Sequence, residues 1–488
     1  MAATRLFDGG RRERLLFCVL AVALVGVRTF VATYYEGFYF DSDQAIVGLM
    51  ARHIAALHDF PIFFYGQSYL LGVQAWIAAP FFAFGRSSVA LLRLPFVLLN
   101  AAVAVAFVVM IAGRAKVRPA FAFVAALPFI VPTPATANQL LDLSGACVEP
   151  IAYALILWTL RRRPALFGAV LAVAFLHREF ILAVVPAVVV VELLLSHAWT
   201  RENWRPAAYG AAGFFVTWLV IDDLKLRESG SALGQQAAML AGKTCFEPGA
   251  VTDGIRELLT TAVPVLYGAK AYPIRSFRMD SPLVGGSAAV AVLVLAALAL
   301  IAWRIAANWR AVRTDKTAAL GLFLALTGLF AASVYPLSCD IRVGLPPLLR
   351  FLLLALLIPI GAAAAFFAVE RAARWRAAVA ALFLLWAAAN LVDNMRLIRL
   401  ASIEPPLNER RALIEYLGDH HIRYARAIYW DAYIIDFLSR ERVLTASMDT
   451  IRIPEYQKEV NDHAADAVYL ERQPCDEGAR VGAWCVHK

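Results

Sequence analysis

Apolar residues run along this chain in long stretches that short polar or basic segments interrupt. A helix needs about 20 apolar residues to cross the hydrocarbon core of a membrane, because each residue adds 1.5 Å, and about eleven stretches approach this length. They are residues 15–33, 91–113, 119–133, 146–160, 165–176, 180–195, 207–221, 283–303, 317–334, 345–369 and 377–391. The pattern predicts an all-α polytopic membrane protein of about eleven transmembrane helices.

Composition supports this prediction and excludes a soluble protein. Of the 488 residues, 61% are hydrophobic and only 17% are charged, whereas soluble domains are about 45–50% apolar. The formal net charge of +9 comes from short clusters between apolar stretches. A nucleic-acid-binding surface would instead show a basic stripe interleaved with aromatic residues. The positive charge therefore indicates which connecting segments face the cytoplasm, not a nucleic-acid partner.

Clusters of Lys and Arg occur in every second connecting segment, and such clusters mark cytoplasmic loops. They lie at residues 11–14, 114–118, 161–163, 201–205, 304–316 and 371–376. The first apolar stretch shows no small-residue cleavage site and is expected to be retained. This arrangement predicts a cytoplasmic N-terminus and, with an odd number of helices, a C-terminus on the outer face.

The three sizeable polar pieces, residues 34–90, 222–281 and 396–488, all fall on the predicted outer face. Chemistry is therefore expected there. The near-match to a phosphate loop, "LAGKTC", lacks its first glycine because position 237 is Ala, so ATP-driven function is not expected. We divide the chain into a membrane module, residues 1–395, and an extracytoplasmic tail, residues 396–488. The tail combines an amphipathic "RALIEYLGDH" with strand-like "RYARAIYW" and "DAVYLE", which predicts a small α/β domain.

The first outer piece carries two carboxylates, Asp41 and Asp43, just after the first apolar stretch. Apolar residues recur at helical spacing over residues 46–57, which predicts a helix on the membrane surface. Residues 65–85 are expected to form a second interfacial or re-entrant helix. Asp43 or Ser42 is the expected N-cap of the first helix. The other carboxylate is then free to accept a proton or bind a cation.

The stretches "FDSDQAIVGLMARHI", "FFYGQSYLLGVQAWIAAPFFAFG" and "LLRLPFVLLN" resemble the first outer loop and second helix of GT-C membrane glycosyltransferases. The most similar group is the protein O-mannosyltransferase-like one, which includes aminoarabinose and lipopolysaccharide-core galacturonosyl transferases. The resemblance is clearest over residues 34–100. "RFLLLALLIP" resembles an Arg-Tyr-Leu element of the family, and "YWDAYIIDFLS" is similar to relatives' tails.

The resemblance implies inverting transfer of a sugar from a polyprenyl-phosphate donor to a lipid, glycan or protein acceptor, on the outer face of the bacterial cytoplasmic membrane. It makes Asp41 and Asp43 the catalytic candidates. An aspartate that caps a helix is a poor base because the amide bonds lower its pKa. We therefore expect Asp43 to cap and orient, and Asp41 to be the general base. Residues Tyr65, Gln67 and Gln74 are candidates for acceptor contacts or loop support.

A departing lipid phosphate needs positive charge where its negative charge develops. Candidates at predicted outer helix ends are His177, Arg178, Arg342 and Arg350. The alternative for each is snorkelling to the interface or an ion pair with a neighbouring acid.

The cysteines are candidates for disulfides, and the cysteines, histidines and carboxylates are candidates for metal ligands. Cys475 and Cys485 lie ten positions apart in the outer tail, where a disulfide is expected. A bridge between Cys245 and Cys339 is possible, but their spacing does not support it. No His and Cys grouping has zinc spacing. A hard cation wants about six oxygen ligands; two aspartates supply too few, so we expect no cofactor and no need for a divalent metal.

Two other classes of protein remain alternatives. A polytopic transporter or flippase of lipid-linked saccharides would also be basic inside, but it would place ionisable groups near the membrane midplane and often repeat its halves. This chain shows no repeat, and its acids cluster at outer boundaries. A non-catalytic assembly protein would need no carboxylate in the first loop.

Overall fold

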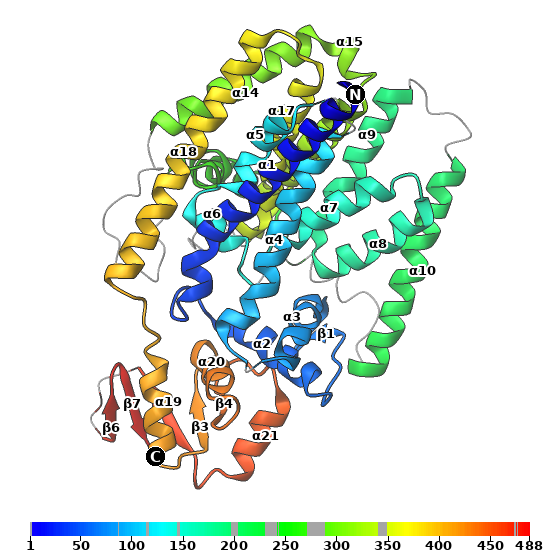
Figure 1. The fold of residues 1–488 in the computed structure, drawn as a ribbon. Helices are drawn as coiled ribbons and strands as arrows, with labels where there is room; N and C mark the ends of the chain where they lie inside the picture. Colours follow the sequence, from blue (N-terminus) through cyan, green and yellow to red (C-terminus); the bar gives the residue numbers. More distant parts are fainter. Residues whose placement is uncertain are drawn as a thin grey trace.

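The computed structural model describes residues 2–85, 87–113, 117–143, 147–196, 204–229, 242, 244–270, 288–339, 349–472, 475 and 477–488. These residues form a bundle of apolar helices and, at one end of it, a small domain with a mixed β-sheet (Figure 1). The N-terminus lies at the opposite end of the bundle from this domain (Figure 1). Arg342 and parts of the predicted outer loop 222–281 lie outside the described residues.

The helices of the bundle follow the apolar stretches of the sequence. They are α1 (Ala2–Tyr34), α4 (Val89–Ala112), α5 (Pro119–Ile130), α6 (Pro134–Gln139), α7 (Glu149–Leu160), α8 (Pro164–His177), η1 (Glu179–Ala183), α9 (Val184–Ser196), α10 (Trp204–Ser229), α12 (Pro248–Glu257), η3 (Leu258–Ala262), α13 (Val263–Tyr267), α14 (Ala288–Ala307), α15 (Trp309–Val312), α16 (Lys316–Val334), η5 (Tyr335–Leu337), η7 (Leu349–Leu356), α17 (Leu357–Val369) and α18 (Ala373–Ile403). Each of the predicted apolar stretches overlaps at least one of these helices.

Within the described residues, seven helices are long and apolar enough to cross a membrane. They are Gly10–Tyr34, Val89–Ala112, Trp204–Arg227, Ala288–Ala307, Lys316–Leu337, Leu349–Val369 and Ala373–Ile403. The apolar helices α5, α7 and α8 are shorter, with 12 to 14 residues. The chain is thus a multi-pass membrane protein, and the count of eleven spans stays a prediction.

Small residues set the closest helix contacts in the bundle. Helices α8 and α10 touch at Gly168 and Gly210, where a methyl group on Gly168 would collide with the Gly210 carbonyl. Helices α16 and α17 meet in the same way at Gly321 and Gly361. In a membrane, where lipid is as apolar as a leucine side chain, such close backbone approach supplies the van der Waals contact that holds helices together. Only 6% of α10 is buried, so most of its surface is left for lipid.

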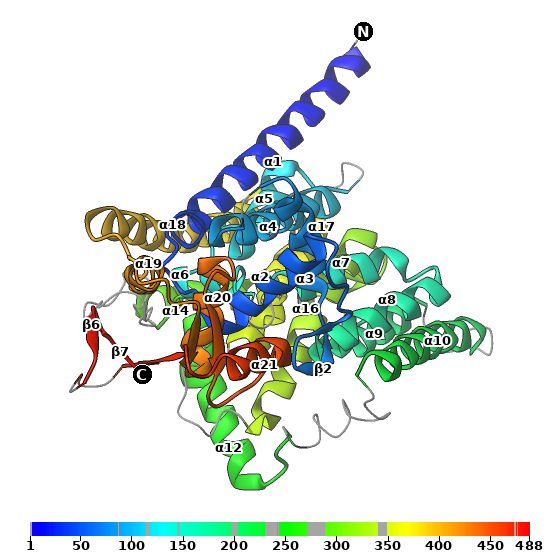
Figure 2. The ribbon, with the colours of Figure 1, turned by 90° about the horizontal axis from the view of Figure 1, so that it is seen from below.

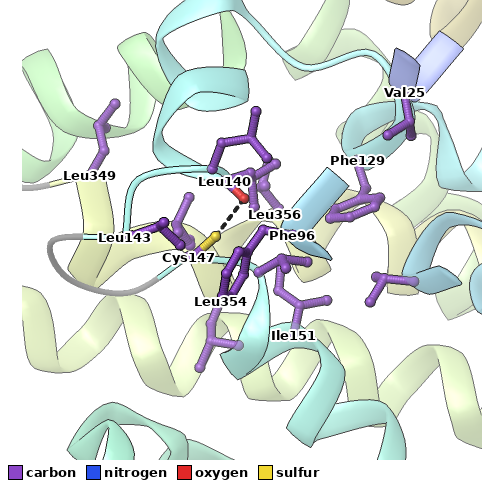
Figure 3. Packing of buried hydrophobic residues seen from close by; sticks show 14 of the residues in the cluster. Val25, Phe96, Phe129, Leu140, Leu143, Cys147, Ile151, Leu349, Leu354 and Leu356 are labelled. Carbon is purple, nitrogen blue, oxygen red and sulfur yellow. Dashed lines mark hydrogen bonds between the residues drawn. The ribbon is translucent and has the colours of Figure 1, made fainter. Parts of the chain in front are cut away.

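The centre of the bundle is closely packed and apolar. Cys147 is fully buried among Phe96, Ile151, Leu143 and Leu354 (Figure 3). Its thiol donates a hydrogen bond to the Leu140 carbonyl at 2.8 Å, which pairs a carbonyl that the end of α6 leaves over. This cysteine is therefore a packing residue.

The first outer piece folds into α2 (Ser42–Ala55), a two-stranded hairpin of β1 (Phe63–Phe64) and β2 (Gln67–Leu71), and α3 (Val73–Ala83). The predicted helix over residues 46–57 is confirmed by α2, most of whose residues are buried within the protein, and its position on the membrane surface stays a prediction. The prediction of one helix over residues 65–85 was wrong in its first third, because Gly66 adopts a left-handed conformation (φ +66°) that turns the chain into the hairpin. The helix begins only after Gly72.

The C-terminal domain contains α19 (Arg410–Asp419), β3 (Tyr424–Ala427), α20 (Tyr429–Ser439), β4 (Leu444–Ser447), α21 (Pro454–Asp462), β5 (Val468–Glu471), β6 (Ala479–Val481) and β7 (Trp484–His487). The sheet order is β4-β3-β5-β7-β6. Strands β4, β3 and β5 are parallel, and β7 pairs antiparallel with β5 and β6. This is the α/β domain that the tail predicted.

The C-terminal domain packs on the first outer piece. Helices α2 and α3 lie between the bundle and α20 (Figures 1 and 2). Arg411 of α19 makes an ion pair with Glu36 at 2.6 Å, and Glu441 accepts from His53 of α2 at 2.9 Å. The domain is therefore attached to the segment that carries Asp41 and Asp43.

Candidate active site

The segment before α2 presents both candidate carboxylates. Asp41 has an extended backbone (φ −123°, ψ 178°), and its Oδ1 accepts from the Gln44 amide at 2.9 Å, so Asp41 is the N-cap of α2. The prediction that Asp43 or Ser42 caps this helix was wrong, because α2 begins at Ser42 and Asp43 falls inside its first turn. The Ser42 hydroxyl instead donates to the Tyr429 carbonyl at 2.5 Å.

A buried arginine from α4 fixes this segment. Arg93, only 2% exposed, donates to the carbonyls of Ala32, Phe38 and Tyr39 and to Oε1 of Gln44. The last three bonds measure 3.0, 2.7 and 2.9 Å. Tyr39 has a left-handed backbone (φ 53°), a strained conformation that persists only where the surroundings enforce it. The cation of Arg93 supplies that enforcement.

Asp43 points toward the C-terminal domain and accepts a hydrogen bond on Oδ1 from the phenol of Tyr429. Burial raises the pKa of Asp43 above its ordinary value. The Tyr429 bond and the positive charge of Arg452 oppose this rise, the negative charge of Asp142 adds to it, and the charge of Arg350 opposes it. No other hydrogen bond to the Asp43 carboxylate occurs in the described part of the chain, so Oδ2 is available to a ligand.

The surroundings of Asp41 disfavour a negative charge more strongly than those of Asp43 do. Burial raises its pKa well above the ordinary range, and the charges of Asp142 and Asp43 raise it further. The Gln44 amide and Arg93 act in the opposite direction with smaller effect. The neutral form of Asp41 is therefore favoured, and its carboxyl group serves as a cap.

Two arginines of the predicted phosphate set lie close to each other, and the charge of one of them, Arg350, reaches Asp43. Arg178 follows α8 and Arg350 lies in η7, close enough for each to feel the other's charge. Arg178 is 9% exposed, and the Nε atoms of both arginines are buried without a hydrogen-bond partner. Such incompletely paired buried cations are typical of sites for an anion.

A cavity of about 270 Å³ is lined by residues that include the sequence neighbours of the two arginines. Arg178 and Arg350 directly precede two of its lining residues, Glu179 and Phe351. The lining is mostly apolar and includes Phe180, Leu182, Ala183, Thr244, Ala331, Val334, Tyr335, Leu337 and Ser338. An apolar cavity with cations at its edge suits an amphipathic anion such as a lipid phosphate.

His177 is placed differently from its neighbour Arg178. It is 1% exposed, and its Nδ1 shares a hydrogen bond with the Tyr153 hydroxyl at 3.1 Å. Its Nε2 has no partner. Gln74 lies in the same interior region, where its amide donates to Glu149 at 2.8 Å. Both side chains therefore hydrogen-bond to α7 in the interior of the bundle.

Tyr65 and Gln67 belong to the hairpin. The Tyr65 hydroxyl donates to Asp59 at 2.6 Å and lies 2.9 Å from Nδ1 of His53. The Gln67 amide, with its oxygen turned toward Arg452, accepts from Nη2 of that residue at 2.6 Å. Both side chains tie the hairpin in place, which is the loop-support role considered for them.

Two disulfides lie on the predicted outer side. One joins Cys475 to Cys485 and the other joins Cys245 to Cys339. The second bridges residues 94 positions apart, a separation from which no pairing could be inferred. Among the described residues, no three His, Cys, Asp or Glu side chains are grouped as metal ligands. Metal independence stays a prediction.

Comparisons with solved structures place this geometry in a known fold. The structure superposes on ArnT from Cupriavidus metallidurans bound to undecaprenyl phosphate with a TM-score of 0.52 and 13% identity, covering 93% of this chain and 92% of that one. The apo state of ArnT from the same organism gives 0.53 and 12%, with 96% and 89% covered. The chain has the GT-C fold. No protein-family model and no curated protein sequence matches it.

Within this GT-C fold, several site residues escaped the sequence reasoning. Asp142 follows α6 in a predicted outer loop, and an acid in such a loop is a signal that could have been weighed. Arg93 stands inside an apolar stretch, where a charge is costly and marks a special role. Tyr429 and Arg452 come from the far end of the chain, and only the docking of the C-terminal domain brings them to Asp43.

Proposed function

We propose that the protein is an inverting glycosyltransferase that moves a sugar from a polyprenyl-phosphate donor to a lipid, glycan or protein acceptor on the outer face of the bacterial cytoplasmic membrane. One observation carries this proposal. Asp43, with one carboxylate oxygen open, lies within electrostatic reach of Arg350, and Arg350 lies within reach of Arg178. Each arginine directly precedes a residue that lines an apolar cavity. The proposed base and the proposed anion site are therefore neighbours.

Asp43 is the proposed general base. The acceptor oxygen attacks the anomeric carbon from the side opposite the phosphate, and its proton passes to Oδ2 of Asp43. The bond between that carbon and the phosphate oxygen breaks, and the electron pair leaves with the lipid phosphate. Proton removal of this kind contributes about 100 to 10,000-fold to a rate. Asp41 keeps the loop in place as the helix cap.

The proposed donor site combines Arg178 and Arg350 with the cavity. The guanidinium groups hold the phosphate and stabilise the charge that develops on it as the sugar departs. The apolar lining takes the first part of the isoprenoid chain. The likeness in fold to ArnT, which was solved with undecaprenyl phosphate, supports this choice of donor class.

The proposed orientation places the N-terminus in the cytoplasm and the C-terminal domain outside. Basic clusters in every second connecting segment support it. Nucleotide sugars are confined to the cytoplasm, so a site on the outer face needs a donor that the membrane carries. The orientation and the donor class are thus consistent with each other.

Mass spectrometry of envelope glycolipids tests the proposal. Extracts are compared from cells with the gene, without it, and without it but supplied with the Asp43→Asn variant. We expect one glycan-bearing species to disappear on deletion and to stay absent with the variant at normal protein yield. Full restoration by Asp43→Asn would exclude the enzyme proposal and favour a transporter or flippase.

A further inference from the structure

The C-terminal domain reaches the proposed base through one side chain. We infer that Tyr429 is a positioning residue for the transfer reaction, which holds the Asp43 carboxylate in place so that Oδ2 faces the acceptor. The inference rests on the proposed function. It gives the small domain a part in the reaction beyond covering the site.

A hydrogen bond from its backbone amide holds Tyr429 in position. Tyr429 is the first residue of α20, and its amide donates to Oδ1 of Asp449 at 2.6 Å. Asp449 also accepts from the Ser447 hydroxyl at 3.1 Å. An amide at a helix start lacks a partner within the helix, so this carboxylate takes the place of a cap and fixes where the helix begins.

Close packing then fixes α20 against α2. Ser42 donates to the Tyr429 carbonyl at 2.5 Å, next to Asp43. About two helical turns further along, the Phe437 ring fills the space where a side chain at Gly48 would stand, and it also contacts Phe40 at 5.6 Å between ring centres. Two packed helices, rather than two mobile loops, therefore set the geometry between the phenol and Asp43.

Arg452 holds the phenol ring from the other side. Its guanidinium carbon lies 5.6 Å from the centre of the Tyr429 ring, and its Nη1 donates to the Gly66 carbonyl at 3.0 Å. This cation thereby joins the C-terminal domain to the hairpin of the outer loop. A ring confined in this way donates its hydroxyl in one direction.

The bond has a predictable effect on the chemistry of Asp43. The groups that face this carboxylate are Tyr429, Arg452, Arg350 and Asp142, with Asp41 and Tyr69 also within electrostatic reach. A hydrogen bond to the ionised form stabilises it and keeps the pKa of Asp43 from rising further. Without the phenol the pKa of Asp43 rises, and a higher pH is needed to keep the base ionised.

The test is the pH profile of the Tyr429→Phe variant. The purified full-length protein is supplied with a detergent extract of the whole envelope of the deletion strain, which contains both unused donor and unmodified acceptor, and formation of the missing species is followed from pH 5 to pH 9. We expect the acid limb of the rate profile to move to higher pH by about one unit. We also expect the rate on the acid limb to fall about tenfold and to recover at higher pH, where the carboxylate is ionised in both proteins.

Tyr424→Phe is the matched control. Its hydroxyl donates to Glu459 at 3.3 Å in the same domain, and neither residue belongs to the site. The control should keep the wild-type profile. If Tyr429→Phe loses the same factor at every pH, or loses nothing, Tyr429 does not act through Asp43 and the inference is wrong. If Asp43→Asn itself is active in this assay, the proposed function fails instead.

A second variant tests the inference even if the Tyr429→Phe protein does not fold. Replacing Tyr429 by 3-fluorotyrosine keeps the hydroxyl and makes it a stronger donor, so the acid limb should move to lower pH. A shift in the same direction as that of Tyr429→Phe, or no shift in either variant, contradicts the inference. A purely structural role for the residue predicts a change in melting temperature with an unmoved profile.

Discussion

Two groups of charged side chains lie within this site, and they differ in how completely they are paired. The loop-holding cluster consists of Arg93, Asp41 and Gln44; Arg93 alone donates to three carbonyls and an amide oxygen. The open cluster consists of Asp43, Arg178 and Arg350. There one carboxylate oxygen is free, and neither guanidinium group makes a hydrogen bond to another described residue; the Nε atoms of these two arginines and of Arg93 are all buried without a partner.

The difference separates structural charge from charge kept for a ligand. Burying a cation is costly unless hydrogen bonds replace the lost water. Arg93 meets most of that cost with four hydrogen bonds from its Nη atoms, although its Nε has no partner. The side chains of Arg178 and Arg350 make no hydrogen bond to another described residue, so a bound anion would compensate them more. Asp41 and Asp43, two residues apart, fall on opposite sides of the same division.

The largest effect is expected from the open carboxylate. Asp43→Asn should lower turnover by about 100 to 10,000-fold, because the asparagine cannot take the acceptor proton. Its melting temperature should stay near wild type. Asp41→Asn is the matched variant, since asparagine caps a helix as well as aspartate does, and it should retain most of its turnover. If Asp41→Asn is the inactive variant and Asp43→Asn is not, the two clusters are assigned the wrong way round.

The arginines of the open cluster come next. Arg178→Gln and Arg350→Gln should each lower kcat/KM by about 100-fold, because each removes charge that stabilises the departing phosphate. Binding of undecaprenyl phosphate, measured in detergent, should weaken in parallel. Arg374→Gln, at the exposed start of α18, serves as a control for loss of one positive charge. Unchanged binding in both site variants would remove the proposed phosphate site.

Arg93 should affect stability rather than chemistry. Arg93→Met leaves buried carbonyl groups and Gln44 without a donor, so we expect the free energy of unfolding to fall by about 2 kcal/mol. Denaturant titration in mixed micelles measures this. Arg178→Met should cost less than half as much, since it breaks fewer bonds. An equal loss of unfolding free energy in the two variants would contradict the distinction between the two clusters.

The smallest effect concerns Asp41 and depends on pH. Its raised pKa means that the folded protein still holds this proton at pH values where the unfolded chain, with an ordinary value of about 4, has released it. The contribution of Asp41 to stability is therefore full below pH 4 and is lost as pH rises through the folded-state pKa. Asparagine has no proton to lose, so the stability of Asp41→Asn relative to wild type should increase between pH 4.5 and pH 7.5.

Asp41→Ala separates the cap from the charge. Loss of the cap should cost about 1 kcal/mol at either pH. Melting temperatures of the three proteins at the two pH values provide the comparison. A constant difference between Asp41→Asn and wild type would show that Asp41 is ionised in the folded protein.

The helices and the tail could be read from the sequence because their signals are local. A long apolar stretch must hydrogen-bond its own backbone in a membrane, so 91–113 could only be a helix, and α4 occupies Val89–Ala112. The tail segments "RYARAIYW" and "DAVYLE" became β3 and β5 for similar reasons. The hairpin before α3 was missed because its turn depends on Gly66, a single residue in an apolar surrounding.

The sequence by itself determined that this chain is a polytopic membrane protein with acids at one boundary, since hydrophobic length and charge placement are additive properties of neighbouring residues. It also singled out Asp41 and Asp43. Which of the two caps the helix, and which stays open, was decided by a shift of two residues in the start of α2 and by Tyr429, which lies 386 positions away from Asp43. A helix start and a contact across the chain depend on how whole elements pack, and no local pattern encodes them.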